Sequence, residues 1–131
     1  MFSMPSSLLV KSVVRGYHVY QVLWEPKVRE KFFVLHEQGN KHDGHAVAVY
    51  REKAPRVIVG HLPQEIAKAC YFFAKHDGKI TGEVTGRRVH SEEAGGLEVP
   101  CRLKFTGHSR NVKKLQELFK RLDLPIISTV S

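Results

Sequence analysis

The sequence has few of the features that mark secreted or membrane-embedded proteins. Only 2 of its 131 residues are cysteine, and Cys70 and Cys101 lie far apart in apolar patterns. Such cysteines indicate buried thiols in a reducing compartment rather than a disulfide framework. No apolar run approaches the roughly 18 residues that span a membrane, and the N-terminus lacks the basic start of a signal peptide. We therefore expect a nuclear or cytoplasmic protein that is not secreted and has no membrane partner.

Motifs for catalysis and for metal binding are also missing. The chain has no C-x-x-C or H-E-x-x-H pair for zinc, no Gly-x-Ser-x-Gly elbow and no glycine-rich phosphate loop after a strand. His36, His42 and His45 lie close together with Asp43 among them, but solvated loop histidines explain this spacing better than zinc ligands do. We expect no enzymatic activity, no cofactor and no metal. A zinc-binding, hydrolase-associated domain is kept as the weakest alternative.

Acidic residues are few compared with basic ones. There are 13 Asp and Glu against 21 Lys and Arg, so the formal net charge is +8. A strongly basic domain favours nucleic acid or another polyanion as its partner. The length and the 42% of hydrophobic residues are enough for one domain with its own core. We place this domain at residues 11–124, between flexible tails at 1–10 and 125–131.

Hydrophobic patterning predicts a mainly β fold with two helices. We expect strands at 11–22, 31–36, 46–50, 57–60, 79–89 and 97–106, and helices near 63–76 and 109–122. Pro100 indicates a sheet edge or a bulge, and Ser109 is expected to cap the second helix. Because strands do not alternate with helices, an OB-like, curved six-stranded β-barrel fits better than a βαβ fold. Ile66, Cys70 and Phe73 recur at helical spacing and should cover one barrel opening.

A small polar site is predicted where two short strands end. A polar turn containing Asp43 leads into the strand at 46–50, and the strand at 57–60 stops at His61, just before the first helix. The two loops could place Asp43 and His61 at neighbouring strand ends, and loops at such a rim commonly carry function. The alternative for Asp43 is a purely local role, in which its carboxylate caps its own turn.

Basic and flat side chains suited to nucleic acid are present on several predicted strands. Nucleic-acid binding needs cations for phosphates and flat groups for bases. The candidate phosphate contacts are Arg15, Lys41, Arg87, Arg88, Arg102 and Lys104. Tyr17, His18 and Tyr20 supply flat groups on the first strand, although ordinary strand packing explains the tyrosines equally well. The five basic residues of the last helix are expected to form a solvated face.

The order of these motifs resembles the HIRAN domain, a DNA-end-binding module attached to SNF-type helicases. The matching elements are Val13-Val14, Tyr17-His18, Phe33-Val34-Leu35, the Asn-x-x-Asp-x-x-Ala-Val-x-Val segment Asn40–Val49, Val-Gly-His-Leu at 59–62, Leu97-Glu98-Val99-Pro100 and Phe105-Thr106-Gly107. Together they cover residues 11–122. The Asn-x-x-Asp-x-x-Ala and Val-Gly-His-Leu elements are fairly specific in combination and weak individually.

This resemblance implies a modified OB-like barrel that binds single-stranded DNA and recognises a free 3′-OH end. Asp43 matches the aspartate that contacts the terminal hydroxyl, and His61 matches the histidine of Val-Gly-His-Leu. His42 stands where a stacking tyrosine is frequent. At the remaining binding positions Tyr17-His18 replaces an Arg-Tyr pair, Gln64 replaces a lysine and Leu97 replaces an aromatic residue. RNA is an alternative ligand, and a helicase or another protein is a further candidate partner.

Two classes of function remain open. The first is a non-catalytic module that binds single-stranded DNA at or near a 3′ end. The second is a protein-interaction module on a HIRAN scaffold that has lost DNA binding, which the changes at Tyr17, His18, Gln64 and Leu97 suggest. DNA binding predicts positive potential around Asp43 and His61. The alternative predicts basic residues that are scattered or confined to the last helix.

Overall fold

A computed structural model of the chain describes most of its residues. The described residues are 5–16, 24–37, 39, 41, 44–91 and 96–130. Five residues predicted for the binding site, Tyr17, His18, Tyr20, His42 and Asp43, lie outside them. Their roles therefore stay predictions from the sequence.

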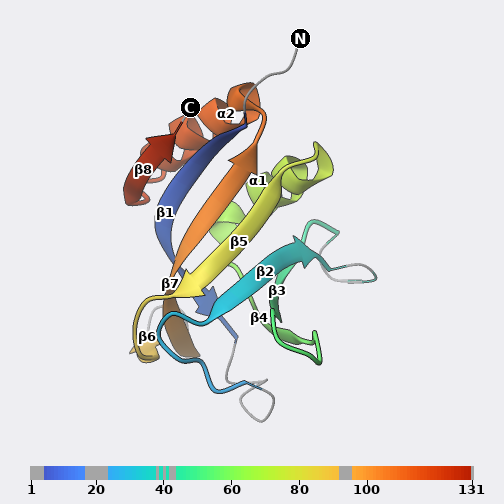
Figure 1. Ribbon diagram of the computed structural model, residues 1–131, viewed down its shortest axis with the longest axis vertical. Coiled ribbons are helices and arrows are strands. Elements are labelled where there is room, and N and C mark those ends of the chain that lie inside the picture. The colour runs from blue at the N-terminus through green and yellow to red at the C-terminus, as the bar shows by residue number, and fades with distance from the viewer. Residues whose placement is uncertain are drawn as a thin grey trace.

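The fold is a closed antiparallel β-barrel with two helices and two short added strands. The elements are β1 (Ser6–Arg15), β2 (Lys31–His36), β3 (Val47–Arg51), β4 (Ile58–His61), α1 (Gln64–Lys75), β5 (Lys79–Val84), β6 (Val89–Ser91), β7 (Gly96–Gly107), α2 (Ser109–Arg121) and β8 (Ile126–Val130). The ring runs β1-β7-β5-β2-β3-β4 and returns to β1, while β6 adds to β7 and β8 adds to β1 (Figure 1). The predicted six-stranded barrel is confirmed.

The barrel closes through two contacts of very different length. β1 pairs with β7 over its whole length, from Ser6 opposite Gly107 to Arg15 opposite Glu98. On its other side β1 meets β4 at one register pair, Arg15 opposite His61. The barrel is therefore held by a long ladder along β7, and its last closure lies at the end of β1.

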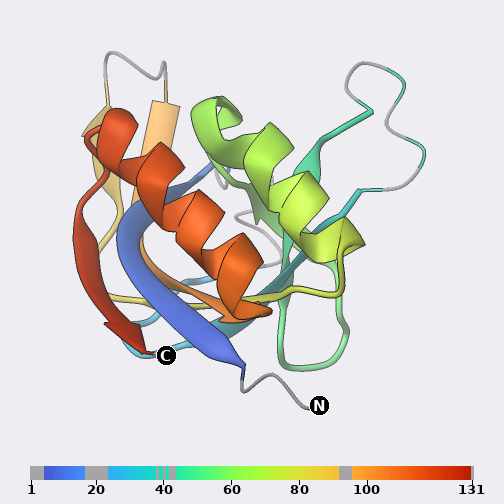
Figure 2. The same cartoon turned by 90° about the horizontal axis from the view of Figure 1, so that it is seen from above.

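The two helices lie side by side on the inner side of the curved sheet (Figure 2). The buried residues of α1 include Ile66, Cys70 and Phe73, all in the hydrophobic core, as the helical spacing predicted. The Phe105 ring of β7 packs edge-on against Phe73 at 5.6 Å and against Phe119 of α2 at 5.4 Å, measured between ring centroids. One continuous core thus joins the barrel to both helices. Among the described residues, no helix is long and apolar enough to cross a membrane.

The strand predicted at 79–89 is two strands, because the chain leaves the sheet near Pro100. β5 ends at Val84 opposite Cys101, and β6 begins at Val89 opposite Glu98. The Pro100 carbonyl accepts a hydrogen bond from the Thr85 amide at 3.0 Å. A residue in a β-strand directs its N–H and C=O to the same edge of the strand. The missing N–H of Pro100 therefore faces the gap between the end of β5 and the start of β6, where no ladder hydrogen bond is lost. Pro100 was predicted to mark a sheet edge or a bulge; the structure has a gap in pairing on this side of β7, while pairing with β1 continues through Pro100 without a register shift.

The expectation of flexible tails was wrong for most of their length. β1 begins at Ser6, and its Leu8 and Val10 are fully buried. β8 pairs with β1 from Ser7 to Val10, at the other edge of that strand. The apolar residues at 8–10 were too few to stand out as a strand, and the partner that orders them lies about 95 residues away at β7.

The predicted cap of the second helix is off by one residue. His108 is the N-cap of α2, and its Nδ1 accepts a hydrogen bond from the Arg110 amide at 3.1 Å. Ser109 is the first helical residue. An imidazole nitrogen can accept a backbone N–H as a cap oxygen does, and sequence preferences favour serine at that position.

Candidate functional site

The candidate site lies where β1 meets β4. We call this place the seam and define it by Arg15 and His61, which face each other, and by their carboxylate partners Glu37, Glu65 and Glu98. His61 ends β4 next to Ala48 of β3, and α1 begins three residues later. Sequence reasoning predicted a polar site at these strand ends, and the structure brings polar side chains from three strands, a loop and a helix together here.

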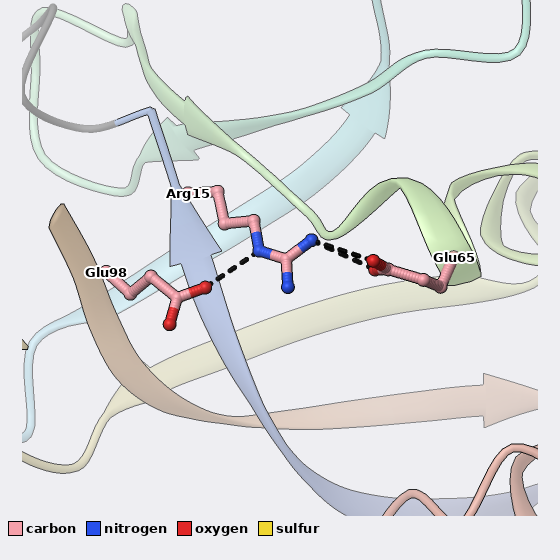
Figure 3. Close-up of polar contacts among 3 residues, drawn as sticks. All are labelled: Arg15, Glu65 and Glu98. Carbon is pink, nitrogen blue, oxygen red and sulfur yellow. Dashed lines mark hydrogen bonds and ion pairs between the residues drawn. The ribbon is translucent and has the colours of Figure 1, made fainter. Parts of the chain in front are cut away.

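The Arg15 side chain is held between two carboxylates from different elements (Figure 3). Its Nε donates to Glu98 Oε2 of β7 at 2.7 Å, and its Nη1 donates to both Glu65 oxygens of α1 at 3.0 and 3.1 Å. Burial alone would lower the pKa of the guanidinium, but the hydrogen bonds to Glu98 and Glu65 outweigh this and raise it. The phosphate-contact role predicted for Arg15 therefore competes with a structural role that joins β1, β7 and α1.

Glu65 is affected in the opposite direction. Its own backbone amide donates to the carboxylate and lowers the pKa of Glu65, and the hydrogen bond from Arg15 lowers it further. The first turn of a helix also favours a negative charge. Glu65 thus stays ionised as the exposed end of the cluster, with 60% of its side-chain surface accessible.

His61 is bonded to Glu37, which begins the loop that carries Asp43. His61 Nε2 donates to Glu37 Oε2 at 2.6 Å, and the Glu37 amide donates to the Ala46 carbonyl at 2.9 Å. The second bond joins the two ends of the loop. The loop that contains Asp43 in the sequence therefore starts and ends beside the histidine predicted to act with it.

Four rings anchor the end of this loop to α1. The Tyr71 ring lies 4.7 Å from His36 and 4.9 Å from His45, and Phe72 lies 5.5 Å from His45, between centroids. His36 Nε2 donates to the Gly44 carbonyl at 2.9 Å. Two of the histidines considered as metal ligands thus pack against aromatic rings. Within the described ranges, no three metal-binding side chains are grouped together.

The structure describes three further residues that were predicted to bind nucleic acid. Gln64 is the exposed first residue of α1. Leu97 is in β7, opposite His90 of β6 and next in sequence to Glu98. Lys41 is exposed in the loop between β2 and β3. Their binding roles stay predictions.

The remaining predicted phosphate contacts do not lie at the seam. Arg87 and Arg88 are exposed between β5 and β6. Arg102 and Lys104 point outward from β7, and Arg102 Nη2 donates to Glu83 Oε1 of β5 at 3.4 Å. The structure therefore divides the basic residues that the sequence grouped as one set.

The seam itself is not strongly basic. Its described residues are three carboxylates, one guanidinium and one imidazole. Positive potential at this site, as predicted for DNA binding, is not supplied by them. The basic residues are instead spread over both helices, the outside of the sheet and the loops, so they are scattered rather than gathered at the seam or confined to the last helix.

Sequence reasoning missed the three carboxylates of the seam. Glu98 occupies a polar position of the alternating β7 pattern, but only the register with β1 shows that it faces Arg15. Glu65 had a local signal, since an acidic residue in the first helical turn is favoured. Glu37 directly follows a strand, and nothing in the sequence indicates that His61 is its partner.

Comparisons with known proteins agree on the fold. No protein-family model and no curated protein matches the chain. The crystal structure of the HIRAN domain of human HLTF matches with a TM-score of 0.66 and 21% identity, over 92% of this chain and 94% of that one. The NMR structure of the HLTF HIRAN domain in its DNA-bound conformation gives 0.63 and 22%, over 88% and 90%. A Lactobacillus plantarum protein gives 0.52 and 16%, over 77% and 98%. The chain has the HIRAN fold.

Proposed function

We propose, from this HIRAN fold and from the seam, that the protein is a non-catalytic module that binds single-stranded DNA at or near a 3′ end. The observation that carries the proposal is the position of His61, bonded to Glu37 at the base of the loop that contains Asp43. The two described ends of this loop lie beside His61, which supports a shared role for the two best-matched motif residues. The formal charge of +8 favours a polyanionic ligand.

A carboxylate suits recognition of a terminal hydroxyl. An ionised Asp43 accepts a hydrogen bond from a 3′-OH and repels a 3′-phosphate. The hydrogen bond that His61 Nε2 donates to Glu37 fixes the orientation of the imidazole ring beside this loop. Neither role requires a bond to be made or broken, which fits a binding module.

Titration with short labelled oligonucleotides tests the proposal. Matched strands that end in a 3′-OH or a 3′-phosphate are titrated at two salt concentrations. We expect binding that weakens steeply as salt rises, because phosphate contacts release counterions, and tighter binding of the 3′-OH strand. Absence of binding at low salt would refute nucleic-acid binding, and equal affinity for both ends would refute end recognition.

Asp43→Asn separates end recognition from turn capping. Asparagine keeps much of the capping ability but removes the charge. If Asp43 reads the hydroxyl, the variant loses the preference for a 3′-OH end. The loss of a charged hydrogen-bond partner costs about 1.5–3 kcal/mol, or roughly 10-fold to 150-fold in affinity. If Asp43 only caps its turn, Asp43→Ala lowers stability by about 1 kcal/mol and Asp43→Asn leaves the end preference unchanged.

A protein-interaction module is the second candidate, and the composition of the seam favours it. Three carboxylates surround Arg15 and His61, and carboxylates at a surface site suit a basic peptide better than a phosphate. RNA is a further alternative ligand for the first candidate. Matched RNA strands belong in the same titrations, and a protein that binds neither DNA nor RNA would support the interaction module.

A further inference from the structure

Four neighbouring strands present a basic surface on the outside of the barrel. We call the solvent side of β1, β7, β5 and β2 the outer face; it faces the viewer in Figure 1. Side chains alternate along each strand, and the register sets them in rows across it. One row is Phe33, Thr81, Lys104 and Leu9, and the next is Lys31, Glu83, Arg102 and Lys11. Both rows cross all four strands.

The lysines of this face are available for an anionic ligand. Within the described part of the chain, Lys31, Lys79 and Lys104 make no ion pair with a carboxylate. They line a hollow of about 390 Å³ together with Arg102. Its acidic lining residues are Glu52 and Glu83. The four cations therefore outnumber the two carboxylates, in contrast to the seam.

The outer face also carries apolar side chains that the fold does not require. Phe32 and Val34 of β2 are buried in the core, so Phe33 and Leu35 point outward. Leu35 is 54% exposed. The Arg56 guanidinium stands over the Phe33 ring at 5.3 Å from its centroid. An arginine over a flat ring among lysines is the combination that stacks a base beside its phosphates.

We propose that a single-stranded nucleic acid crosses the outer face, where Lys31 and Lys104 bind its phosphates and Phe33 stacks one base. The outer positions of β1 continue from Lys11 to Arg15, so this surface leads to the seam. The inference rests on the proposed function and extends it, because the outer face supplies phosphate contacts where the seam is poor in cations. The end of the nucleic acid lies at the seam, and the rest of the nucleic acid lies over the sheet.

Two strand lengths and a charge-matched pair of variants test this inference. An oligonucleotide of about 4 nucleotides and one of about 16 span the site sizes typical of such barrels. Lys31→Gln with Lys104→Gln removes two charges from the outer face. Lys113→Gln with Lys120→Gln removes two charges from exposed positions of α2. All four lysines are exposed, so both variants should unfold at the temperature of the parent protein.

At low salt, the outer-face variant should bind the long oligonucleotide at least about 10-fold more weakly than the parent protein does. The slope of log affinity against log salt should fall by about 1.4, since each lost contact to a single strand accounts for about 0.7. Its affinity for the short strand should not change. The α2 variant should bind both oligonucleotides with the same slope of log affinity against log salt as the parent protein. Equal losses in the two variants would overturn the inference, because they would show a general effect of net charge.

Phe33→Leu tests the stacking contact separately. Leucine keeps an apolar side chain at this half-buried position and removes the flat ring. We expect at least about a 5-fold loss of affinity for the long strand, the lower limit for one stacked base, with the salt slope unchanged. Parent affinity in this variant, or in the outer-face lysine variant, overturns the inference while the proposed function stands. If the parent protein binds neither strand, the proposed function fails and the inference fails with it.

Discussion

The Arg15 cluster permits a quantitative prediction about which of its two ion pairs stabilises the fold. The Glu98 side chain is 12% exposed and its bond to Arg15 is 2.7 Å long, whereas the Glu65 side chain is 60% exposed. Water screens the Glu65 pair, and exposed pairs typically contribute about 0.2–1 kcal/mol. The Glu98 pair is better shielded, although Arg15 is itself 35% exposed. We therefore expect a coupling of about 1.5 kcal/mol, the lower end for charged hydrogen bonds.

Double-mutant cycles measure both couplings. Arg15→Met keeps most of the aliphatic stem, and Glu98→Gln and Glu65→Gln keep the shape of each partner. Urea unfolding of the single and double variants gives each coupling as a difference of unfolding free energies. The Arg15–Glu98 coupling should exceed the Arg15–Glu65 coupling by about 1 kcal/mol. Added salt should weaken mainly the Glu65 coupling. Equal couplings, or the reverse order, would show that shielding from water does not decide the strength of these pairs.

The same cluster has a defined pH dependence. The folded protein lowers the pKa of Glu65 from its ordinary value of 4.5. A group whose pKa is lower in the folded state stabilises that state above its unfolded pKa, and the contribution is lost as pH falls through the folded pKa. The stabilisation from Glu65 should therefore be complete at neutral pH and be lost as pH falls below 4.5 and through the lowered pKa of the folded state. Glu65→Gln should flatten the unfolding free energy in that range, and a curve parallel to that of the parent would contradict the assignment.

Three further perturbations test the barrel. Gly82→Ala would place a methyl group within the Phe32 ring, so we expect a loss of about 1–3 kcal/mol in urea unfolding; parent stability would mean that the ring moves aside. Deleting residues 1–10 removes two fully buried aliphatic side chains of β1, worth about 3–6 kcal/mol together, and should abolish cooperative thermal unfolding; a sharp transition would contradict this. Burial raises the pKa of Cys70 and of Cys101 to about 12, so neither should react with a thiol reagent near pH 8 until urea is added, and rapid labelling of the native protein would refute their burial.

Local sequence patterns predicted the elements of this fold that depend on residues close together in the sequence. The spacing of Ile66, Cys70 and Phe73 located α1, and turn residues bounded the strands of the β2–β3–β4 meander to within a residue. The first half of β1 and all of β8 escaped prediction because each depends on pairing with a distant strand. Short apolar segments do not reveal such partners.

The candidate site, like the fold, could be predicted from the sequence only in part. The motif positions of Asp43 and His61 followed from the linear pattern. The partners of Arg15 and His61 did not, since Glu98 and Glu37 reach them only through the strand register and the loop closure. The sequence therefore predicted Arg15 as a phosphate contact when the structure bonds it to two carboxylates. Charge counts give the number of cations in a chain, but register decides which of them remain available.

The long ladder between β1 and β7 has a consequence for folding during synthesis. The meander of β2, β3 and β4 pairs neighbours in sequence and can form early. β1 is made first, yet its partner β7 ends at Gly107. At 5–20 residues per second the ribosome needs about 5–20 s to make the intervening chain. Throughout that interval Leu8, Val10 and Val14 of β1 lack the strand that buries them. The nascent chain thus carries an open apolar edge until nearly the whole domain has been made, and its period of greatest vulnerability to aggregation precedes barrel closure.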